Sequence, residues 1–475
     1  WASATELDAF RFLSYNPCSS DGARPSVAAP SRRSCPMEAD VEVRILPGRP
    51  LRGRARVPGD KSIAHRALIV AALAEGTSHI HGFDPLDDCL RTLEALRACG
   101  VRIEQAGPRR LRVEGRGLRG LAAPAGPLDC GLSGTTLRLL AGLLAGQPLT
   151  ATLDGHEPLR RRPMGRVTGP LRRMGARIDG PDGGQHAPLT VHGGRLQGID
   201  YTLPMASAQV KSAILLAALN AEGETVVREP APSRDHTERL LRRLGVALDI
   251  GDGVIRCREA RPWRGARLDL PGDISSAAFL VVAANLVPGS EVHIYGVGLN
   301  PTRSAFLDVL RAMGGDATVL SERVSEGEEP LGDLVARPAG LRGVAIGGSL
   351  IPRLIDELPI LAVAATQAQG TTVVRDAAEL RVKETDRIAA LARELGALGA
   401  SFEPTVDGFV IEGPTPLRGA WVDAHGDHRL AMALAVAGLV ARGETVVAGG
   451  ETVAKSFPGF FGVLGALGAA VERAA

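Results

Sequence analysis

Lysine is rare in this chain of 475 residues, and each lysine stands among polar residues. Lysine and arginine together number 55, of which four are lysine and 51 arginine: Lys61 in GDKSIAHR, Lys211 in SAQVKSA, Lys383 in RVKETDR and Lys455 in ETVAKSFPG. An ammonium group is a compact point charge on a flexible stem, whereas guanidinium is a planar fork. Since either cation serves solubility, a retained lysine is a candidate for chemistry. Chance retention explains one lysine better than it explains all four.

Other polar residues gather where one type of predicted helix begins. They are Lys61-Ser62, Ser133-Gly134-Thr135, Ser207 with Gln209, Asp356-Glu357, and Asp427-His428-Arg429. Free N–H groups and the helix dipole make such ends anion sites. Capping explains a Ser or an Asp there. Because cations are disfavoured at that end of the dipole, capping does not explain Lys, Arg and His. We expect several of these ends to converge in a cleft and bind a polyanion.

Further cations lie in predicted loops or helix starts: Arg160-Arg161-Arg162, Ser233-Arg234, Lys383 to Arg387, and Lys455. Arginine forks bind carboxylates and phosphates through paired hydrogen bonds. The net charge of +2 and the aromatic content of 3% argue against a nucleic-acid partner, which would favour bulk positive charge and stacking platforms. The expected ligand is a small molecule that carries phosphate and carboxylate groups.

The composition is that of an ordinary globular protein, with 45% hydrophobic and 23% charged residues. The length predicts two to three domains, and the apolar runs are too short or too interrupted to cross a membrane. Six cysteines, at 18, 35, 89, 99, 130 and 257, form no CxxC pair or metal spacing, which predicts reduced thiols and a cytoplasmic location. Residues 1–36 lack periodicity and are interpreted as a disordered leader or an upstream artefact before a candidate start at Met37. A transit peptide is the weaker interpretation, because Glu6, Asp8 and Asp21 are acids that such peptides avoid.

Two helix patterns alternate six times along the chain. The first is a small-residue apolar helix followed by glycine and a β-branched strand, and its glycines, expected at the C′ position, are Gly76, Gly146, Gly223, Gly289, Gly370 and Gly443. The second is amphipathic, with apolar residues at i, i+3, i+4 and i+7 and arginines between them, as in RTLEALRACGVRI. Six copies predict an α/β protein of six repeats.

A duplicated Pro-Gly-Asp segment predicts where the repeats divide into halves. It occurs at 58–60, before the first repeat, and at 271–273, before the fourth. We interpret the two segments as crossings between a discontinuous domain of 37–58 plus 273–475 and a second domain of 59–272. The active site is then expected in the interdomain cleft. Two ordinary type II turns are the alternative.

The motifs GDKSIAHRAL, LSGTTLRLL, RRRPM, SAQVKSAILLA, SRDHTERL, LIDELPILA, RVKETDRI, GDHRLAMA and AKSFPGF resemble, in order, those of the 5-enolpyruvylshikimate-3-phosphate synthase family. The resemblance covers essentially all of 41–475. It implies two globular domains, each of three βαβαββ repeats, in an inside-out α/β barrel. It also implies transfer of the enolpyruvyl group of phosphoenolpyruvate to the 5-hydroxyl of shikimate 3-phosphate, through a tetrahedral intermediate and with release of phosphate. The expected partners are these substrates and the inhibitor glyphosate. We expect a monomer with no cofactor, metal, nucleic acid or membrane.

The resemblance also implies site residues, carried over position by position. The shikimate 3-phosphate site would comprise Lys61, Ser62, Arg66, Ser207, Gln209, Ser233, Asp356 and Lys383, with Arg234 added for its charge. The phosphoenolpyruvate site would comprise Lys61, Gly134, Arg162, Gln209, Arg387, His428, Arg429 and Lys455. The catalytic residues would be Asp356 and Glu384, as acid–base carboxylates, and Lys61.

Leu132, Ala208 and Glu379 depart from residues found in many or some family members, and bear on substrate contacts rather than on the reaction. The alternative within the same fold is the enolpyruvyl transferase acting on UDP-N-acetylglucosamine. That family has Asn after the first lysine and a reactive cysteine in a mobile loop, whereas here Ser62 follows Lys61 and no cysteine lies in a comparable loop. A nucleic-acid-processing protein is a second rival, and a non-catalytic anion-binding relative is a third. The third should have lost Asp356 or Glu384, and both are present.

Overall fold

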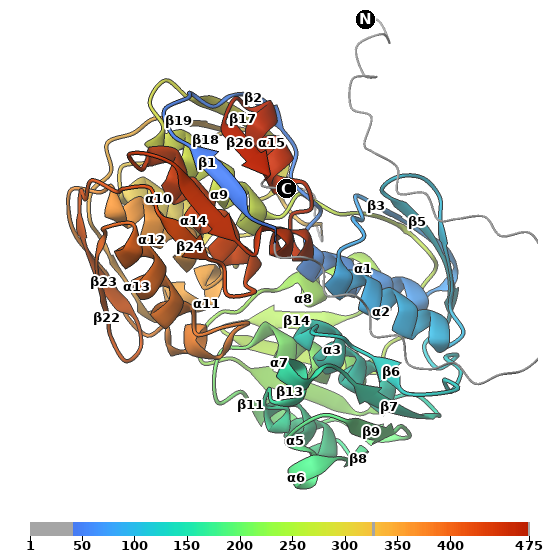
Figure 1. Ribbon diagram of the computed structural model, residues 1–475. Helices are drawn as coiled ribbons and strands as arrows, with labels where there is room; N and C mark the ends of the chain where they lie inside the picture. Colours follow the sequence, from blue (N-terminus) through green and yellow to red (C-terminus); the bar gives the residue numbers. More distant parts are fainter. Residues whose placement is uncertain (1–40, 325–327, 474–475) are drawn as a thin grey trace, which may run out of the picture. The chain divides into compact units, whose positions relative to one another are not determined.

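The computed structural model describes residues 41–324 and 328–473. The predicted leader and Met37 lie outside these residues. The described chain builds six similar units, each with two main helices and a four-stranded sheet (Figure 1). This confirms the predicted α/β class and the six repeats.

The first three units contain the following main elements: α1 (Lys61–Ala72), β3 (Glu75–His81), α2 (Asp87–Ala98), β4 (Arg102–Gln105) and β5 (Arg110–Arg116); α3 (Gly134–Ala145), β7 (Thr150–Asp154), α5 (Gly165–Arg173), β8 (Arg177–Asp179) and β9 (Leu189–His192); α7 (Ala208–Ala218), β13 (Glu224–Arg228), α8 (His236–Arg243), β14 (Leu248–Gly251) and β15 (Val254–Arg258). The other three contain α9 (Ile274–Leu286), β17 (Glu291–Gly298), α10 (Ala305–Ala312), β18 (Asp316–Arg323) and β19 (Leu331–Arg337); α12 (Leu358–Thr366), β21 (Gly370–Val374), α13 (Arg387–Ala397), β22 (Ser401–Pro404) and β23 (Phe409–Gly413); α14 (His428–Val440), β25 (Thr445–Ala448), α15 (Phe460–Ala466), β26 (Ala470–Arg473) and β1 (Val43–Leu46).

One parallel edge strand completes each sheet, and the other pairings are antiparallel. The edge strands are β16 (Arg267–Asp269), β6 (Leu128–Asp129), β11 (Asp200–Thr202), β2 (Arg52–Ala55), β20 (Ala345–Ile346) and β24 (Trp421–Asp423). The strand order is the same in all six sheets, for example β6-β7-β9-β8 and β24-β25-β1-β26. The shorter elements are α4 (Glu157–Arg160), α6 (Pro181–Gly184), β10 (Leu196–Gln197), β12 (Ala221–Glu222), α11 (Ile351–Leu354) and the 3₁₀ turns η1 (Gly348–Leu350), η2 (Ala378–Val382) and η3 (Gly450–Lys455).

Strand pairing closes the units into two sets of three. β16, which follows the third unit, pairs with β3 of the first. β2 pairs with β17 of the fourth unit, and β1 lies between β25 and β26 of the sixth. The buried apolar residues divide in the same way, into one cluster drawn from 63–268 and another from 43–57 and 274–469.

The two Pro-Gly-Asp segments lie side by side. Gly59 and Gly272 form an antiparallel bridge, the N–H of Asp60 donates to the carbonyl of Pro271, and the N–H of Asp273 donates to that of Pro58, both at 2.8 Å. A Cβ at position 59 would lie 2.1 Å from the carbonyl oxygen of Gly82, so this close backbone approach requires glycine.

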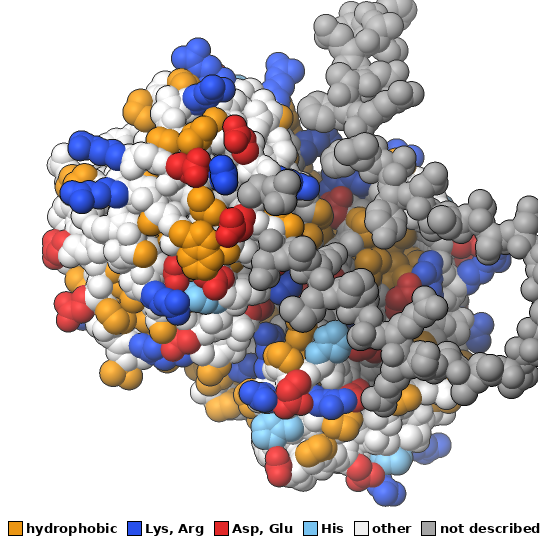
Figure 2. All heavy atoms as spheres, viewed as in Figure 1, with side chains coloured by type: hydrophobic (Ala, Val, Ile, Leu, Met, Phe, Trp, Pro, Cys, Tyr) orange, Lys and Arg blue, Asp and Glu red, His pale blue; other side chains and the backbone are white. Residues whose placement is uncertain are grey.

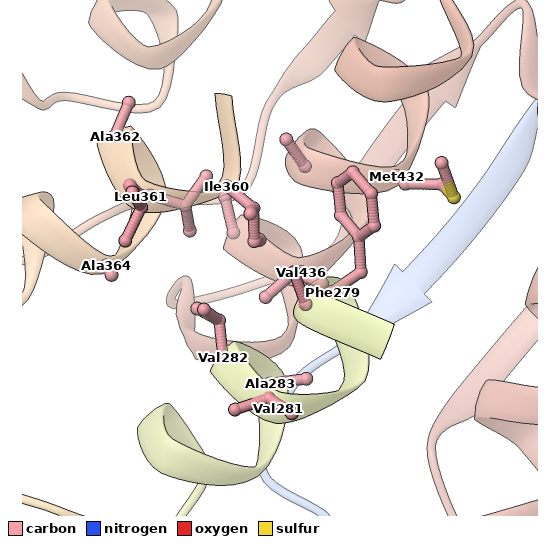
Figure 3. Packing of buried hydrophobic residues seen from close by; sticks show 14 of the residues in the cluster. Phe279, Val281, Val282, Ala283, Ile360, Leu361, Ala362, Ala364, Met432 and Val436 are labelled. Atoms are coloured by element: carbon pink, nitrogen blue, oxygen red, sulfur yellow. The ribbon is translucent and has the colours of Figure 1, made fainter. Parts of the chain in front are cut away.

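The first type of helix is buried on all sides, because its sequence has no polar stripe. In α9 and α14 nearly every residue is buried. Phe279 of α9, Ile360 of α12 and Val436 of α14 lie together in the core (Figure 3). The charged residues of these helices lie in their N-terminal halves, and most of them are buried.

The predicted C′ position of the six glycines that follow this helix type is wrong. Five of them do have positive φ, for example Gly76 at 85°, but Gly146 has φ −90°. Gly76 lies inside β3, because Leu73 already closes α1 in a right-handed conformation. The C′ rule holds instead for the second helix type, where the glycine directly after the C-cap has positive φ in all six units: Gly100, Gly175, Gly245, Gly314, Gly399 and Gly468.

The surface agrees with the near-neutral charge. Basic and acidic side chains are interspersed on the face seen in Figure 2. The four cysteines of the described residues are free and buried. None of the helices in the described chain combines the length and the apolar character that a bilayer crossing needs.

Candidate active site

The predicted helix starts are observed, and most of their hydroxyl or carboxyl groups do cap. Asp60, Ser133, Ser207 and Asp427 each accept a hydrogen bond from a backbone N–H in the first turn of their helix. Asp356 does not cap, because α12 begins at Leu358 after Glu357 without a side-chain cap. The capping explanation for Asp356 is therefore wrong, and its carboxylate has other partners.

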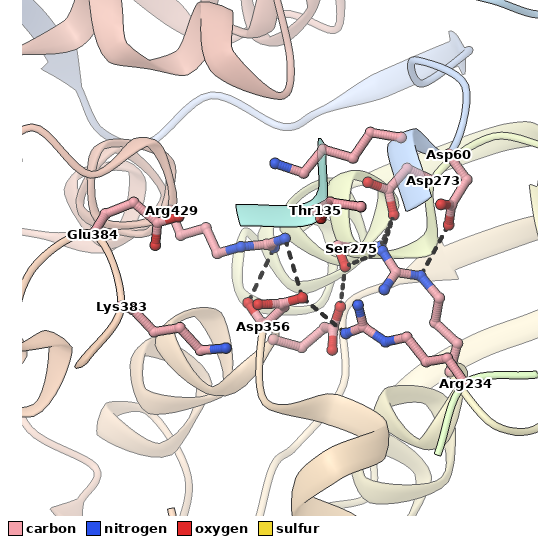
Figure 4. A network of polar contacts seen from close by, with 12 residues as sticks. Asp60, Thr135, Arg234, Asp273, Ser275, Asp356, Lys383, Glu384 and Arg429 are labelled. Atoms are coloured by element: carbon pink, nitrogen blue, oxygen red, sulfur yellow. Dashed lines mark hydrogen bonds and ion pairs between the residues drawn. The ribbon is translucent and has the colours of Figure 1, made fainter. Parts of the chain in front are cut away.

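Asp356 is surrounded by arginines from distant parts of the chain (Figure 4). Arg234 Nη2 lies 2.8 Å from its Oδ2, and Arg429 Nη2 and Arg387 Nη1 each lie 3.6 Å from a carboxylate oxygen. Arg429 also donates to the Asp356 carbonyl, at 3.1 Å. Burial by itself would raise the pKa of Asp356, but Arg429 and Arg234, with Lys383 and Arg387, hold it well below its usual range. Asp356 is thus ionised near neutral pH.

Glu384, the second predicted carboxylate, has a similar environment. Arg387 Nη2 lies 2.7 Å from its Oε2, and Arg162 Nη2 lies 3.9 Å from its Oε1. Burial opposes ionisation, but Arg387, His428, Arg162 and Lys61 together lower the pKa of Glu384 far below its ordinary value. Arg387 itself is buried and is also held by Asp427, at 2.7 Å. Two ionised carboxylates therefore lie among a larger number of cations.

The predicted lysines of the site have other partners. Lys61 Nζ lies 3.0 Å from Asp88, and Lys383 Nζ lies 3.6 Å from Glu379, the residue noted as a departure. Lys455 donates to the carbonyl of Gly426 at 2.9 Å. Burial lowers the pKa of Lys61, but Asp88 outweighs this, so the pKa is raised and Lys61 stays charged.

His428 is buried, and neither of its ring nitrogens has a partner among the described residues. Burial, followed by the charge of Lys61, lowers its pKa to about 3. The ring is therefore neutral near neutral pH. An unpaired neutral imidazole beside Lys61 and Glu384 leaves hydrogen-bonding capacity that a bound anion or hydroxyl group would use.

One arginine of the cluster was missed by sequence reasoning. Arg138 of α3 is buried, and it donates to the side-chain carbonyl of Gln209, whose amide donates to Thr135 Oγ1 at 2.9 Å. Burial, followed by Arg166 and Arg162, lowers its pKa to about 9. An arginine inside the apolar stretch LRLLAGLLA was the available signal, because a buried cation needs a partner.

The remaining predicted residues of the shikimate 3-phosphate site come from three places: Ser62 and Arg66 from α1, Ser207 from the start of α7, and Ser233 from the segment before α8. Arg66 donates to the Ser62 carbonyl at 2.8 Å, to Thr237 Oγ1 at 2.7 Å and to Ser212 Oγ at 2.9 Å. The Ser233 hydroxyl donates to Glu229. Ser207 caps α7, and no contact joins its side chain to another predicted site residue within the described ranges.

A second missed arginine, Arg303, connects the two chain crossings to the site. Its Nε lies 2.9 Å from Asp60 and its Nη2 lies 2.7 Å from Asp273. Nη2 also donates to Ser275 Oγ at 2.9 Å, and Ser275 donates to Glu357, the neighbour of Asp356. No local sequence pattern indicated these contacts of Arg303, because its partners are far apart in the chain.

A groove of about 1050 Å³ lies elsewhere, along the crossings, and contains none of the predicted site residues. Its lining includes Val57, Arg109, Gly272 and Asp333. The functional assignment therefore follows the clustering of charge at the helix starts rather than the size of a groove.

Comparisons with known proteins identify the family of this chain. Residues 45–464 match the family model described as EPSP synthase (3-phosphoshikimate 1-carboxyvinyltransferase). A 3-phosphoshikimate 1-carboxyvinyltransferase of Brevibacillus brevis is 51% identical over 423 residues, which is 89% of this chain and 99% of the relative. One from Herpetosiphon aurantiacus is 54% identical over 414 residues, 86% of this chain and 96% of the relative.

Solved structures show the same relationship. The EPSP synthase of Acinetobacter baumannii superposes with a TM-score of 0.83 at 43% identity, over 92% of this chain and 100% of that one. The fold is shared by the enolpyruvyl transferase NikO of Streptomyces tendae. It is 21% identical to this chain, with a TM-score of 0.74 over 92% of this chain and 99% of that one. The resemblance inferred from the motifs is confirmed: the chain belongs to the EPSP synthase family.

Proposed function

We propose that the charged cluster around Asp356 and Glu384 is the active site in which this chain carries out the reaction of its family. That reaction transfers the enolpyruvyl group of phosphoenolpyruvate to shikimate 3-phosphate, a step in aromatic amino acid biosynthesis. The observation that supports the location most strongly is the pair of ionised carboxylates held within a surplus of buried cations. Such a surplus is balanced when two polyanionic substrates bind.

For shikimate 3-phosphate we propose contacts from α1, α7 and the segment before α8. Ser62 and Arg66 lie within one turn of α1, and Ser233 and Arg234 are adjacent in sequence. Hydroxyl groups and guanidinium forks are suitable donors to a phosphate group. The Ser233 hydroxyl, which donates to Glu229, would turn from that carboxylate to the phosphate. The complete proposed set is Lys61, Ser62, Arg66, Ser207, Gln209, Ser233, Arg234, Asp356 and Lys383.

Phosphoenolpyruvate would lie beside Glu384, on the side where Arg387, Arg429 and Arg162 gather. Gly134 begins α3 there, so its N–H is free and no Cβ blocks the approach of a small anion. The complete proposed set is Lys61, Gly134, Arg162, Gln209, Arg387, His428, Arg429 and Lys455. The inhibitor glyphosate, also a small anion, would occupy the same place.

In the addition step, the 5-hydroxyl oxygen of shikimate 3-phosphate bonds to C2 of phosphoenolpyruvate while a proton is added to C3. We assign Glu384 as the acid that donates the proton to C3, and Asp356 as the base that accepts the proton of the hydroxyl group. In the elimination step a proton leaves C3, the double bond re-forms and the C2–O bond to phosphate breaks. The two carboxylates thereby exchange the roles of acid and base.

Glu384 must carry a proton to act as the acid, although its surroundings favour the ionised form. Its low pKa is caused chiefly by Arg387, with Arg162 and Lys61 among the charged neighbours. Phosphate and carboxylate groups of the substrate would neutralise these three cations, and the pKa of Glu384 would then rise. Substrate binding itself would thus prepare the acid.

We also propose domain boundaries, localisation and assembly. The two sets of units and the two buried clusters support domains of 37–58 plus 273–475 and of 59–272, with the site in the cleft between them. The free buried thiols are consistent with a reducing, cytoplasmic location. We further propose that the protein works as a monomer.

Release of phosphate in the presence of each acceptor tests the function. Phosphoenolpyruvate with shikimate 3-phosphate should release phosphate in step with formation of the enolpyruvyl ether. UDP-N-acetylglucosamine should give no release above background, since the alternative transferase is not favoured by the comparisons. The opposite preference would overturn the proposal.

A further inference from the structure

Lys211 is the one lysine of the four that has no proposed contact with substrate, and it lies buried behind residues that do. It projects from α7, one turn after Ser207, and its side chain is 1% exposed. Its Nζ lies 2.8 Å from Glu229 Oε2 and 2.6 Å from Glu238 Oε1. It also donates to the carbonyl of Ser233, at 3.4 Å. Both carboxylates are buried as well.

An ammonium group in this position serves neither solubility nor simple packing. Burial alone would lower the pKa of Lys211, but Glu238 and Glu229 outweigh it and raise the pKa, so the group stays charged. Buried charge networks rarely stabilise a fold more than apolar residues of the same volume would. A role in orienting neighbouring groups explains the cluster better than a contribution to stability does.

The neighbours of Lys211 are residues of the proposed shikimate 3-phosphate site. Glu229, held by Lys211, accepts the hydrogen bond from the Ser233 hydroxyl. Ser212, the next residue on α7, accepts a hydrogen bond from Arg66 at 2.9 Å, and also contacts Thr237. The cluster thus holds Ser233 directly, through its backbone carbonyl and through Glu229. It reaches Arg66 only through chain neighbours, because Lys211 adjoins Ser212 on α7 and Glu238 adjoins Thr237 on α8, and these two hydroxyls hold the guanidinium.

We propose that Lys211, with Glu229 and Glu238, positions Ser233 and Arg66 for the phosphate group of shikimate 3-phosphate. The inference rests on the proposed function. Without Lys211 the two buried carboxylates would lose their counterion. Burial already raises the pKa of Glu238, so one of them would take up a proton, and the hydrogen bonds that hold Ser233 would rearrange. Phosphoenolpyruvate would be affected much less, because its proposed contacts lie around Glu384.

Three variants test this proposal. Lys211→Met removes the charge, and Lys211→Met/Glu229→Gln/Glu238→Gln removes it without leaving an unpaired carboxylate. Asn285→Ala is the control: Asn285 is buried at the end of α9, where it bonds to both backbone groups of Asp316, and it has no contact with the proposed site among the described residues.

The measurements are melting temperature, KM for each substrate with the other saturating, and calorimetric affinities for shikimate 3-phosphate and for shikimate. In Lys211→Met, the KM for shikimate 3-phosphate should rise about tenfold or more, as expected for lost charge-assisted hydrogen bonds, while that for phosphoenolpyruvate stays within about threefold. The preference for shikimate 3-phosphate over shikimate should fall by a similar factor. The triple variant should fold like the parent and should still bind shikimate 3-phosphate more weakly than the parent does.

Asn285→Ala should melt earlier with both KM values unchanged. The proposal is overturned if the folded triple variant has parental affinity for shikimate 3-phosphate. It is equally overturned if both KM values rise together, in proportion to the loss of stability. Failure of the proposed function would give a different result, because the parent itself would then not turn over the two substrates.

Discussion

Replacing Glu384 by glutamine removes one negative charge and one transferable proton while keeping the shape of the side chain. The substitution should lower the free energy of unfolding only slightly. Glu384 is 31% exposed, and Arg387, its buried partner, keeps Asp427 at 2.7 Å. Loss of such a partly exposed ion pair costs about 1 kcal/mol or less. A role limited to the ion pair therefore predicts a slightly lower melting temperature and near-parental turnover.

The acid–base role predicts a different result. Loss of a group that transfers a proton reduces turnover about 10²–10⁴-fold, which corresponds to about 3–5 kcal/mol in the activation free energy. The KM for phosphoenolpyruvate should stay the same or fall, because a carboxylate among cations competes with the anionic substrate. Incorporation of solvent deuterium at C3 should slow in step with turnover. Asp356→Asn should also lose turnover, with its melting temperature largely kept.

Glu394→Gln provides the control for this experiment. Glu394 is a buried carboxylate on α13, the helix that follows Glu384, and it bonds to His425 at 2.8 Å and to the N–H of Asp423 at 3.0 Å. This variant should melt earlier but turn over like the parent. The reasoning is refuted if Glu384→Gln and Asp356→Asn both keep turnover within a few-fold of the parent, or if deuterium incorporation is unaffected while turnover falls.

Three further predictions concern single residues. Lys61→Arg and Lys455→Arg should each cripple turnover with unchanged circular dichroism and melting, because a planar fork does not replace a point charge; near-parental rates would contradict this. In Gly134→Ala the new Cβ would lie 3.3 Å from Arg162 Nη1, so titrations should show weaker binding of phosphoenolpyruvate and still weaker binding of glyphosate, and unchanged affinities would place Gly134 outside the site. His65 is buried, and burial lowers its pKa from 6.5 to about 3. Between these pH values the unfolded state therefore binds more protons than the folded state does. The free energy of unfolding should fall as the pH drops from 6.5, by roughly 2–3 kcal/mol at pH 4.5. Melts of His65→Gln should lack this part of the slope, and an identical slope would contradict it.

The sequence predicts the helix starts of this fold well, because their signals are local. A capping residue such as Ser133 or Asp427, followed by an apolar run, specifies a helix without reference to distant residues. The glycines of the first helix type were misplaced, because a right-handed residue such as Leu73 also ends a helix, and the sequence does not distinguish these endings.

The parts of the site that sequence reasoning missed depend on long-range contacts. Arg138 meets Gln209, and Arg303 meets Asp60 and Asp273, only after several units have folded. Asp356 looked like a cap because it precedes an apolar helix, but the nearest charged partner of its carboxylate is Arg234, 122 residues away. Composition and motifs thus identify which residues are unusual, whereas the tertiary structure decides which of them meet.

The most direct test of the central claim is a single-turnover experiment with enzyme in excess over labelled phosphoenolpyruvate, quenched at short times. With shikimate 3-phosphate present, the account predicts a transient species that contains both substrates, and its decay should match the release of phosphate and the appearance of the enolpyruvyl ether. Without shikimate 3-phosphate, the label should remain in phosphoenolpyruvate. Release of phosphate without the acceptor, or formation of the ether with no transient in which both substrates are joined, would contradict it.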